Sequence, residues 1–169
     1  MQIINSNAND IPEIFRLYNL VIDYQKERFT VYWPKFELSL VETEIIENRQ
    51  WKIVINNEVA CVFATTFYDP LIWEEKNKDP AVYIHRIATN PHYRGKKFVE
   101  HIVEWAKQYA KENNKIFIRL DTVGDNKKLI DHYCKCGFTF LGLVDLPDRQ
   151  GLPQHYQTDD VCLFEIALQ

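Results

Sequence analysis

A short basic turn between a strand-like segment and a long amphipathic helix is the feature that most restricts the fold of this sequence. The apolar run Val82–Thr89 is stopped by Asn90-Pro91, and Arg94, Lys96 and Lys97 follow where a helical pattern begins. The first N–H groups of a helix lack partners within the helix and carry a partial positive charge. The turn therefore predicts a binding place for a phosphate-bearing ligand, and the alternative is a basic helix start that only faces solvent.

Helices and strands alternate after this turn. Apolar residues recur at three- and four-residue steps over 95–113, which predicts a helix with one core face. The nearly continuous apolar run Ile116–Leu120 predicts a buried strand. Asp125-Asn126 is typical of a helix start, and Gly137 suits the residue just after that helix. The stretch 82–138 therefore predicts strand, turn, helix, strand and helix.

Two helices are predicted near the N-terminus, after a short strand at Ile3-Ile4. Asp10 is typical of an N-cap, with Glu13 three residues later in a capping-box arrangement. The apolar spacing that follows continues to about residue 27. A second helical pattern covers about 35–48.

Four further runs have the character of strands. Trp51–Ile55 and Val59–Phe67 are separated by Asn56-Asn57-Glu58, which predicts a hairpin. Two last strands are predicted at 138–143 and 161–168, joined by a polar loop.

The segment Asp69–Asp79 is charged and contains Pro70. We expect it to be an exposed, mobile loop. Leu71, Ile72 and Trp73 within it could cover a pocket or a partner surface.

Length and charge limit the classes of function. The 169 residues are enough for one domain with a hydrophobic core, and we expect a single domain over residues 1–169. A net charge of -4 argues against a nucleic-acid partner. No apolar run approaches the roughly 20 residues of a membrane span, and the N-terminus lacks a signal-peptide pattern. We therefore expect a cytoplasmic protein with reduced cysteines and no membrane partner.

His132, Cys134 and Cys136 lie close in sequence and raise the question of a metal site. No CxxC pair accompanies them, so we expect no zinc and no other metal. A cysteine nucleophile is also disfavoured, because nothing in the sequence directs a base toward a particular cysteine.

The order of predicted elements is β α α β β β α β α β β. Helices alternate with strands late in the chain, and a hairpin lies early. This order predicts an α/β (α+β) fold with a mixed sheet and helices on both faces.

The residues around the basic turn match a known family. Its pyrophosphate loop has Arg or Gln, two residues, Gly, any residue, and then Gly or Ala, and Arg94–Val99 stands in that place. In its second signature an Asn begins a helix, a Tyr follows seven residues later, and Gly-Phe comes after, as in Asn126, Tyr133 and Gly137-Phe138. The chain resembles the GNAT family of N-acetyltransferases, most specifically over 82–143. The resemblance implies a mostly antiparallel central sheet of about six or seven strands.

The resemblance also implies acetyl-CoA as the acyl donor. Backbone amides of the turn would hold the pyrophosphate, and its cations would assist. Strand backbone before the turn would pair with pantetheine as an added strand does. Asn126 would contact the cofactor, and its alternative role is that of a helix N-cap. The implied cofactor-binding residues are Ile87, Ala88, Thr89, Arg94, Gly95, Lys96, Lys97, Phe98, Val99 and Asn126.

Two residues depart from the family's loop. Lys97 occupies the Gly position and Val99 the Gly/Ala position. Glycine lets backbone approach phosphate closely. If both residues have ordinary helical dihedral angles, their N–H groups stay available, and Lys97 adds charge while crowding the site.

Acetyl transfer to an amine requires a deprotonated amine, a polarised thioester carbonyl and a proton for the leaving thiolate. Tyr133 matches the family's tyrosine beside the cofactor sulfur and is the implied general acid, with core packing as the alternative. Tyr83, His85 and Ile87 share one strand face, where relatives often place a Glu or His. His85 is therefore the candidate base, with a structural, hydrogen-bonded histidine as the alternative. Asp121 ends the next strand and could bind the amine.

These implications lead to an N-acetyltransferase that moves an acetyl group from acetyl-CoA to a primary amine of a small molecule or peptide by direct attack. The alternative is a degenerate acyl-CoA-binding or regulatory domain without turnover, suggested by Lys97 and Val99. The acceptor cannot be read from the sequence, because its pocket would come from variable loops around 25–35, 68–80 and 145–158. A homodimer through the C-terminal strands would fit the family.

Overall fold

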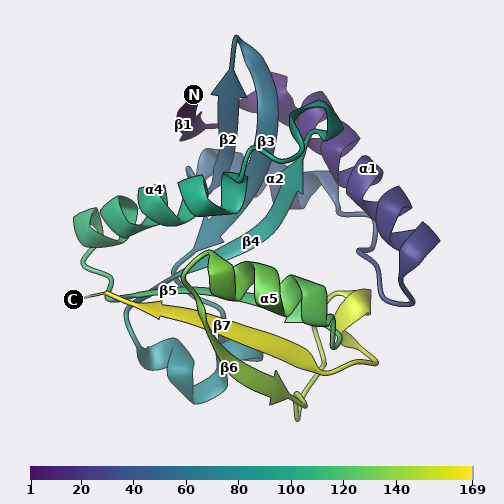
Figure 1. The fold of residues 1–169 in the computed structure, drawn as a ribbon, viewed down its shortest axis with the longest axis vertical. Helices are drawn as coiled ribbons and strands as arrows, with labels where there is room; N and C mark the ends of the chain where they lie inside the picture. The colour runs from purple at the N-terminus through teal and green to yellow at the C-terminus, as the bar shows by residue number, and fades with distance from the viewer. Residues whose placement is uncertain (169) are drawn as a thin grey trace. The chain divides into compact units, whose positions relative to one another are not determined.

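The computed structural model describes residues 1–168, whose strands form a mixed sheet (Figure 1). The strands are β1 (Gln2–Asn5), β2 (Gln50–Ile55), β3 (Glu58–Thr66), β4 (Ala81–Thr89), β5 (Phe117–Val123), β6 (Thr139–Val144) and β7 (Val161–Ala167). Their order in the sheet is β1-β2-β3-β4-β5-β7-β6. β4 and β5 pair in parallel through Ala81–Tyr83, whereas β1–β2, β2–β3, β5–β7 and β6–β7 are antiparallel. The predicted α/β fold with a mostly antiparallel mixed sheet is confirmed.

The helices follow the predicted order, with one short addition. They are α1 (Ile11–Arg28), α2 (Leu38–Ile46), α3 (Pro70–Trp73), α4 (Phe98–Glu112) and α5 (Lys127–Lys135). The addition is α3, which lies in the segment predicted to be a loop. Across residues 1–168, no helix combines the length and apolar character that crossing a membrane requires.

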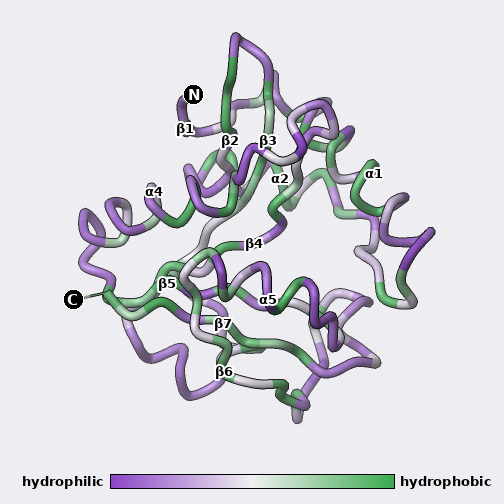
Figure 2. The backbone as a smooth tube through the Cα atoms, viewed as in Figure 1, coloured by the Kyte–Doolittle hydropathy of each residue, from purple (hydrophilic) through white to green (hydrophobic). Residues whose placement is uncertain are grey.

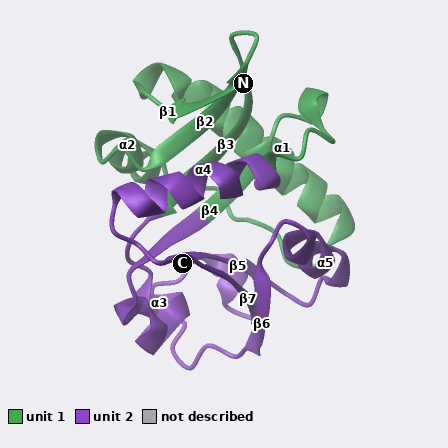
Figure 3. Cartoon of the chain, turned by 60° about the vertical axis from the view of Figure 1, so that its left-hand side comes forward, with its two compact units in different colours: residues 1–65, 85–98 green, residues 66–84, 99–169 purple. Residues whose placement is uncertain are grey.

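The chain forms two compact units, each built from two stretches (Figure 3). Unit 1 comprises Met1–Thr65 and His85–Phe98, and unit 2 comprises Thr66–Ile84 and the chain from Val99 onward. The single domain expected over residues 1–169 remains a prediction.

The core of unit 1 is built from helix faces and strand residues. Ile14, Leu17 and Tyr18 of α1 pack with Val41 of α2 and with residues of β3 and β4. All of these side chains are nearly inaccessible to solvent. The helical spacing read from the sequence of α1 thus corresponds to a buried stripe.

The hairpin of unit 1 joins β2 and β3 through Asn56 and Asn57, as predicted. Both residues are left-handed, with φ values of 51° and 65°. Asparagine tolerates this region better than most residues, and two such residues fit the twist of a two-residue hairpin. Figure 2 shows the hydrophilic tip between two more hydrophobic strands.

The N-terminal cap of α1 differs from the prediction. Asp10 makes no capping hydrogen bond to α1. Instead, Asn7 and Asp10 form a capping box around the preceding 3-10 turn, and Asp10 binds Lys52 Nζ at 2.7 Å. The predicted Asp10–Glu13 box is therefore wrong, because the Asp10 carboxylate is already engaged by two other partners.

The segment predicted to be a mobile loop contributes to the core of unit 2. Ile72 and Trp73 of α3 are only 3% and 2% exposed. They pack in one cluster with Ala81 and Tyr83 of β4 and with residues of β7. The expectation of an exposed loop is wrong for α3, because Ile72 and Trp73 turn inward, although Leu71 stays exposed.

Candidate functional site

The basic turn after β4 is fastened to β3 by Asn90. The Asn90 backbone N–H donates to the carbonyl of Ala60 at 2.9 Å, and its Nδ2 donates to the carbonyl of Val59 at 3.2 Å. Its Oδ1 accepts from the N–H of His92 at 3.2 Å and caps the 3-10 turn Pro91–Tyr93. Asn90 is 7% exposed, so buried polar contacts hold the start of the turn.

The next part of the turn has left-handed backbone at Gly95 (φ 80°) and Lys97 (φ 55°). Lys97 therefore does not have the helical dihedral angles considered from the sequence, and α4 begins only at Phe98. A residue with a side chain pays on the order of 1 kcal/mol for this conformation relative to glycine. Lys97 nevertheless keeps the kind of backbone angle for which the family's glycine is suited. Val99 lies within α4.

Two backbone amides of the turn are already engaged. The N–H of Arg94 donates to the carbonyl of Pro91 at 3.3 Å, and that of Lys96 donates to the carbonyl of Tyr93 at 3.4 Å. Both bonds are longer than the usual 2.9–3.0 Å. A phosphate that used these two amides would compete with weak turn hydrogen bonds.

The side chain of Arg94 is exposed and lies over an aromatic ring of α1. Its guanidinium carbon is 5.4 Å from the ring centre of Tyr24, and that of Arg28 is 4.5 Å from the same ring. Cation–π contacts at exposed sites contribute about 0.5–1 kcal/mol. The ring thus brings two like charges together on the surface of unit 1.

The end of β4 presents Ile87, Ala88 and Thr89. Ala88 is fully buried in the unit 1 core, whereas Ile87 and Thr89 are half-buried. Thr89 Oγ1 donates to Cys61 Sγ at 3.8 Å. Burial raises the pKa of Cys61 to about 12, so this thiol is inert and behaves as a small apolar side chain.

His85, the candidate base, is half-buried on β4. Burial, followed by the charges of Arg86 and Arg49, lowers the pKa of His85 to about 3. The imidazole is therefore neutral at every physiological pH. A group with so low a pKa is a weak proton acceptor, although it can still form hydrogen bonds.

Arg86 is a charged residue within β4 that the sequence reasoning did not select. Its Nη2 forms a close ion pair with Glu44 Oε1, and its Nε donates to the hydroxyl of Tyr18 at 3.4 Å. Burial opposes the charge of Arg86, but Tyr18 and Glu44 outweigh burial and raise its pKa. A charged residue inside an otherwise apolar strand was the signal that could have indicated a buried partner.

Two further candidates lie in unit 2. Asn126 is the N-cap of α5, as predicted, because its Oδ1 accepts from the N–H of Leu129 at 3.2 Å. The ring of Tyr133 lies 5.2 Å from that of Phe164 and 6.0 Å from that of Phe138, centre to centre. These contacts hold the aromatic ring of Tyr133 in place.

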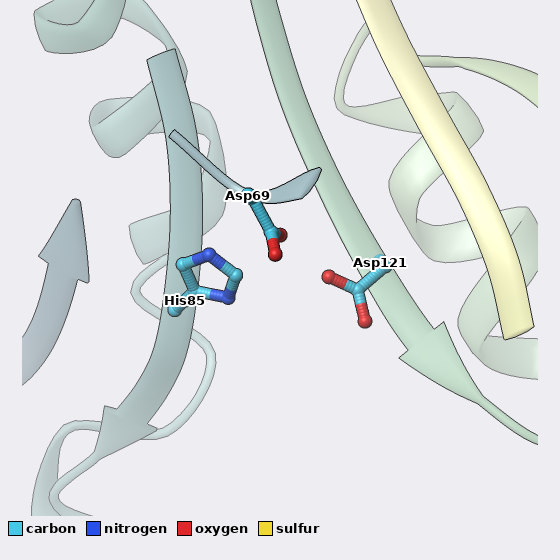
Figure 4. Close-up of side chains that lie close together, drawn as sticks. All are labelled: Asp69, His85 and Asp121. Carbon is cyan, nitrogen blue, oxygen red and sulfur yellow. The ribbon is translucent and has the colours of Figure 1, made fainter. Parts of the chain in front are cut away.

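Two carboxyl groups of unit 2 face each other. Asp69 precedes α3 and Asp121 lies on β5, and an oxygen of each is within 4.8 Å of the other. Figure 4 shows the two carboxyl groups pointing toward one another, and it also labels His85 of unit 1.

These carboxyl groups hold their protons unusually tightly. Burial, with the charge of Asp121 adding to it, raises the pKa of Asp69 to about 8. Burial raises the pKa of Asp121 to about 6, against a hydrogen bond at 2.7 Å from the hydroxyl of Tyr156. Both groups can exchange a proton near neutral pH. The sequence indicated Asp121 but not Asp69, whose environment depends on distant residues.

Two curated relatives match part of the chain. The uncharacterized N-acetyltransferase YesJ of Bacillus subtilis is 28% identical over 79 residues, which are 47% of this chain and 44% of that protein. The streptothricin acetyltransferase of Escherichia coli is 37% identical over 71 residues, 42% of this chain and 40% of that protein. The matches therefore span less than half the length of either relative.

Solved structures match over almost the whole chain. An acetyltransferase of the GNAT family from Listeria monocytogenes has a TM-score of 0.79 and 20% identity, covering 99% of this chain and 94% of that one. YncA of Salmonella typhimurium, solved with acetyl-CoA, has a TM-score of 0.69 and 13% identity, covering 100% and 94%. At these identities the likeness shows a common fold.

The sequence also matches a family model. Residues 16–138 match the model of the acetyltransferase (GNAT) family, and they include the basic turn, the strand before it and the helix that carries Tyr133. The chain therefore belongs to the acetyltransferase (GNAT) family.

Proposed function

We propose that this chain is an N-acetyltransferase that moves the acetyl group of acetyl-CoA to a primary amine of a small molecule or peptide. The observation that carries the proposal is the turn after β4. It combines the Asn90 anchor, left-handed backbone at Gly95 and Lys97, and a basic surface at the start of α4. A relative of the same fold was solved with acetyl-CoA, which supports this donor.

In this proposal the donor binds through its phosphates and its pantetheine. Residues 94–99 bind the pyrophosphate by backbone amides and positive charge. The backbone of Ile87–Thr89 pairs with pantetheine in the manner of an added strand. Asn126 uses its Oδ1 as a helix cap, which leaves its Nδ2 as the donor for the cofactor.

The reaction needs two proton transfers. The neutral amine attacks the thioester carbonyl, the new C–N bond forms, and the C–S bond breaks. The leaving thiolate takes a proton from the hydroxyl of Tyr133, and the amine gives its proton to a base. Packing of Tyr133 between two rings fits a general acid that must hold one position.

Two candidates compete for the role of base. His85 is the candidate from the sequence, but its pKa of about 3 makes it a weak base. Asp121, with a pKa of about 6 and Asp69 opposite, is better matched to neutral pH and would also attract a cationic amine.

Donor binding is tested by calorimetric titration with acetyl-CoA. We expect micromolar binding by the wild type and at least tenfold weaker binding by Arg94→Ala, about 1.4 kcal/mol. Arg16→Ala is the matched control, since Arg16 is an exposed arginine of unit 1 that pairs with its helix neighbour Glu13. No binding of acetyl-CoA, CoA or longer acyl-CoAs would remove the enzyme proposal.

Turnover is tested with a panel of primary amines that includes streptothricin, the substrate named for one relative. Tyr133→Phe should lower kcat at least tenfold, whereas Tyr68→Phe, an exposed tyrosine of unit 2, should not. Binding of acetyl-CoA without transfer to any amine would favour the second candidate, a degenerate acyl-CoA-binding or regulatory domain. The departures Lys97 and Val99 favour that candidate.

The pH profile of kcat/KM separates the two bases. If Asp121 is the base, activity rises as pH increases through about 6, and Asp121→Asn abolishes the rise. If His85 is the base, its pKa of about 3 gives no rise between pH 5 and 8, and His85→Gln lowers activity evenly.

A further inference from the structure

A strained residue lies in the middle of β4. Arg86 has φ 50°, whereas strand residues have φ near −120° to −140°. A residue with a side chain in this region is strained and keeps the conformation only where its surroundings impose it. Arg86 lies between His85 and Ile87, so the kink separates the two parts of β4 that the proposed function uses.

The surroundings of Arg86 hold its side chain from two helices. The guanidinium pairs with Glu44 of α2, whose side chain is only 5% exposed, and donates to Tyr18 of α1. It also lies 5.3 Å from the ring centre of Phe36. Each contact comes from unit 1, so the side chain is fixed within one compact body.

A second layer of hydrogen bonds holds the partners. The hydroxyl of Tyr18 donates to Gln50 Oε1 at 3.3 Å, and Gln50 Nε2 donates to the carbonyl of Phe63 at 3.3 Å. Tyr18 and Gln50 are 1% and 0% exposed. The chain of contacts therefore reaches from the kink in β4 to the backbone of β3.

Stability alone does not account for this arrangement. A buried ion pair contributes little net stability, and an apolar pair of similar size is often equal or better. Here the ion pair also accompanies backbone strain, which adds a further cost. A second oxygen of Glu44, Oε2, is buried and accepts no hydrogen bond from residues 1–168. The Glu44–Arg86 ion pair thus costs free energy and leaves one carboxylate oxygen without a hydrogen bond from residues 1–168. These features indicate that the pair serves to hold the backbone conformation at Arg86.

We propose that Glu44 and Arg86 are positioning residues, whose ion pair clamps β4 in its kinked form and so sets the direction of the 87–89 backbone that receives the acyl-CoA. This inference rests on the proposed function. Neither residue touches the reacting atoms; both act through the strand.

The decisive variant replaces the pair by apolar residues. Glu44→Leu/Arg86→Met removes both charges, so no buried charge is left unpaired and the fold is retained. We expect a Tm equal to or above that of the wild type, together with at least tenfold weaker binding of acetyl-CoA by calorimetry. Arg49→Met is the control, because Arg49 also approaches Glu44, at 3.7 Å, but lies outside β4. It should bind acetyl-CoA within threefold of the wild type.

A glycine rescue separates positioning from stability. Glu44→Leu/Arg86→Gly loses more packing than the methionine variant, but glycine adopts positive φ without a clamp. We expect it to have the lower Tm of the two double variants and yet bind acetyl-CoA several times more tightly. A purely structural role would give the opposite order, with affinity following Tm.

The possible results of these binding and melting experiments test the clamp and the proposed function separately. The inverted order of Tm and affinity supports the clamp. Wild-type binding with affinities that follow Tm, or that stay within threefold in both double variants, overturns the clamp and leaves the proposed function in place. Failure of the wild type itself to bind acetyl-CoA overturns the proposed function, and the positioning role with it.

Discussion

Arg86 of unit 1 and Arg119 of unit 2 are strand arginines with 15% and 0% of their side chains exposed, yet they are held in different ways. Arg86 has left-handed backbone, one close carboxylate and one tyrosine hydroxyl at 3.4 Å. Arg119 has a regular strand position and a complete set of partners. We therefore assign Arg119 the role of stabilising unit 2, and Arg86 the role of holding the backbone conformation of β4.

Arg119 uses every donor of its guanidinium. Nη2 binds Asp79 at 2.6 Å and Glu165 at 2.7 Å, and Nε donates to Glu165 at 2.8 Å. Nη1 donates to the carbonyl of Lys76 at 2.6 Å and to the hydroxyl of Tyr83 at 3.3 Å. Although the side chain is 0% exposed, its charge is fully compensated, which is the condition for a buried ion to be tolerated.

The largest effect is expected from breaking the Arg119 cluster. Arg119→Met leaves Asp79 and Glu165 without their cation and should lower the free energy of unfolding by about 3–5 kcal/mol in urea titrations. Arg119→Lys should recover only a small part, because an ammonium cannot reproduce the planar set of donors. A loss below about 1 kcal/mol would contradict the stabilising role assigned to this arginine.

A matched replacement of both ion pairs sharpens the comparison. Glu44→Leu/Arg86→Met should change the free energy of unfolding by no more than about 1 kcal/mol. Glu165→Leu/Arg119→Met should lower it by about 2–3 kcal/mol, because Asp79 keeps an uncompensated charge. Equal losses in the two double variants, measured by urea denaturation, would mean that the two arginines serve the same purpose.

The facing carboxyl groups of Asp69 and Asp121 in unit 2 should make stability depend on pH. The pKa of Asp69 is raised from 3.8 to about 8, so the folded state binds more protons than the unfolded state in this window. The free energy of unfolding should therefore fall as pH rises from about 4 to about 8. Asp69→Asn should remove much of the fall and stabilise the protein by about 2 kcal/mol at pH 8.

Asp131→Asn is the control for that experiment, because Asp131 is an exposed aspartate on α5. Its thermal-melt series across the same pH range should parallel that of the wild type. A wild-type stability that rises with pH over this range would contradict the burial of charge at Asp69.

The smallest effect concerns Lys97, a further residue of unit 1 with left-handed backbone. Lys97→Gly should raise the free energy of unfolding by about 0.5–1 kcal/mol, because glycine adopts positive φ freely. Lys97→Ala keeps the same backbone penalty and should not show this gain in stability. If alanine stabilises as much as glycine in chemical denaturation, the side chain rather than the backbone angle is the cause.

The sequence predicted the order of helices and strands because periodicity and turn residues are local signals. The Asn56-Asn57 hairpin and the Asn126 cap were predicted for this reason, and both are confirmed. Asp10 stands at the N-cap position of α1 as predicted, but its capping hydrogen bonds were mispredicted, because Lys52 lies 42 residues away and competes for the carboxylate. The α3 segment was mispredicted because its burial depends on partners elsewhere in unit 2.

Some features of the candidate site likewise have local sequence signals, whereas others depend on residues far away in the sequence. The basic turn could be recognised from its spacing, and the roles assigned to its residues and to Tyr133 and His85 stay predictions. The kink at Arg86 could not be recognised, because Glu44 is 42 residues away and a dihedral angle leaves no mark in an apolar run. The pKa values of His85 and Asp69 also depend on burial, which only the fold determines.

Lys97 shows how a sequence motif can change while the shape it encodes persists. The Asn90 anchor fixes one end of the turn, and the backbone angle at position 97 has the sign that glycine is usually needed for. A lysine can therefore stand at a position suited to glycine at a small energetic cost and place a charge beside the start of α4. A pattern written in residue letters records a mismatch at position 97, although its backbone angle is one that glycine adopts freely. Family patterns of this kind are better written as conformations than as residues.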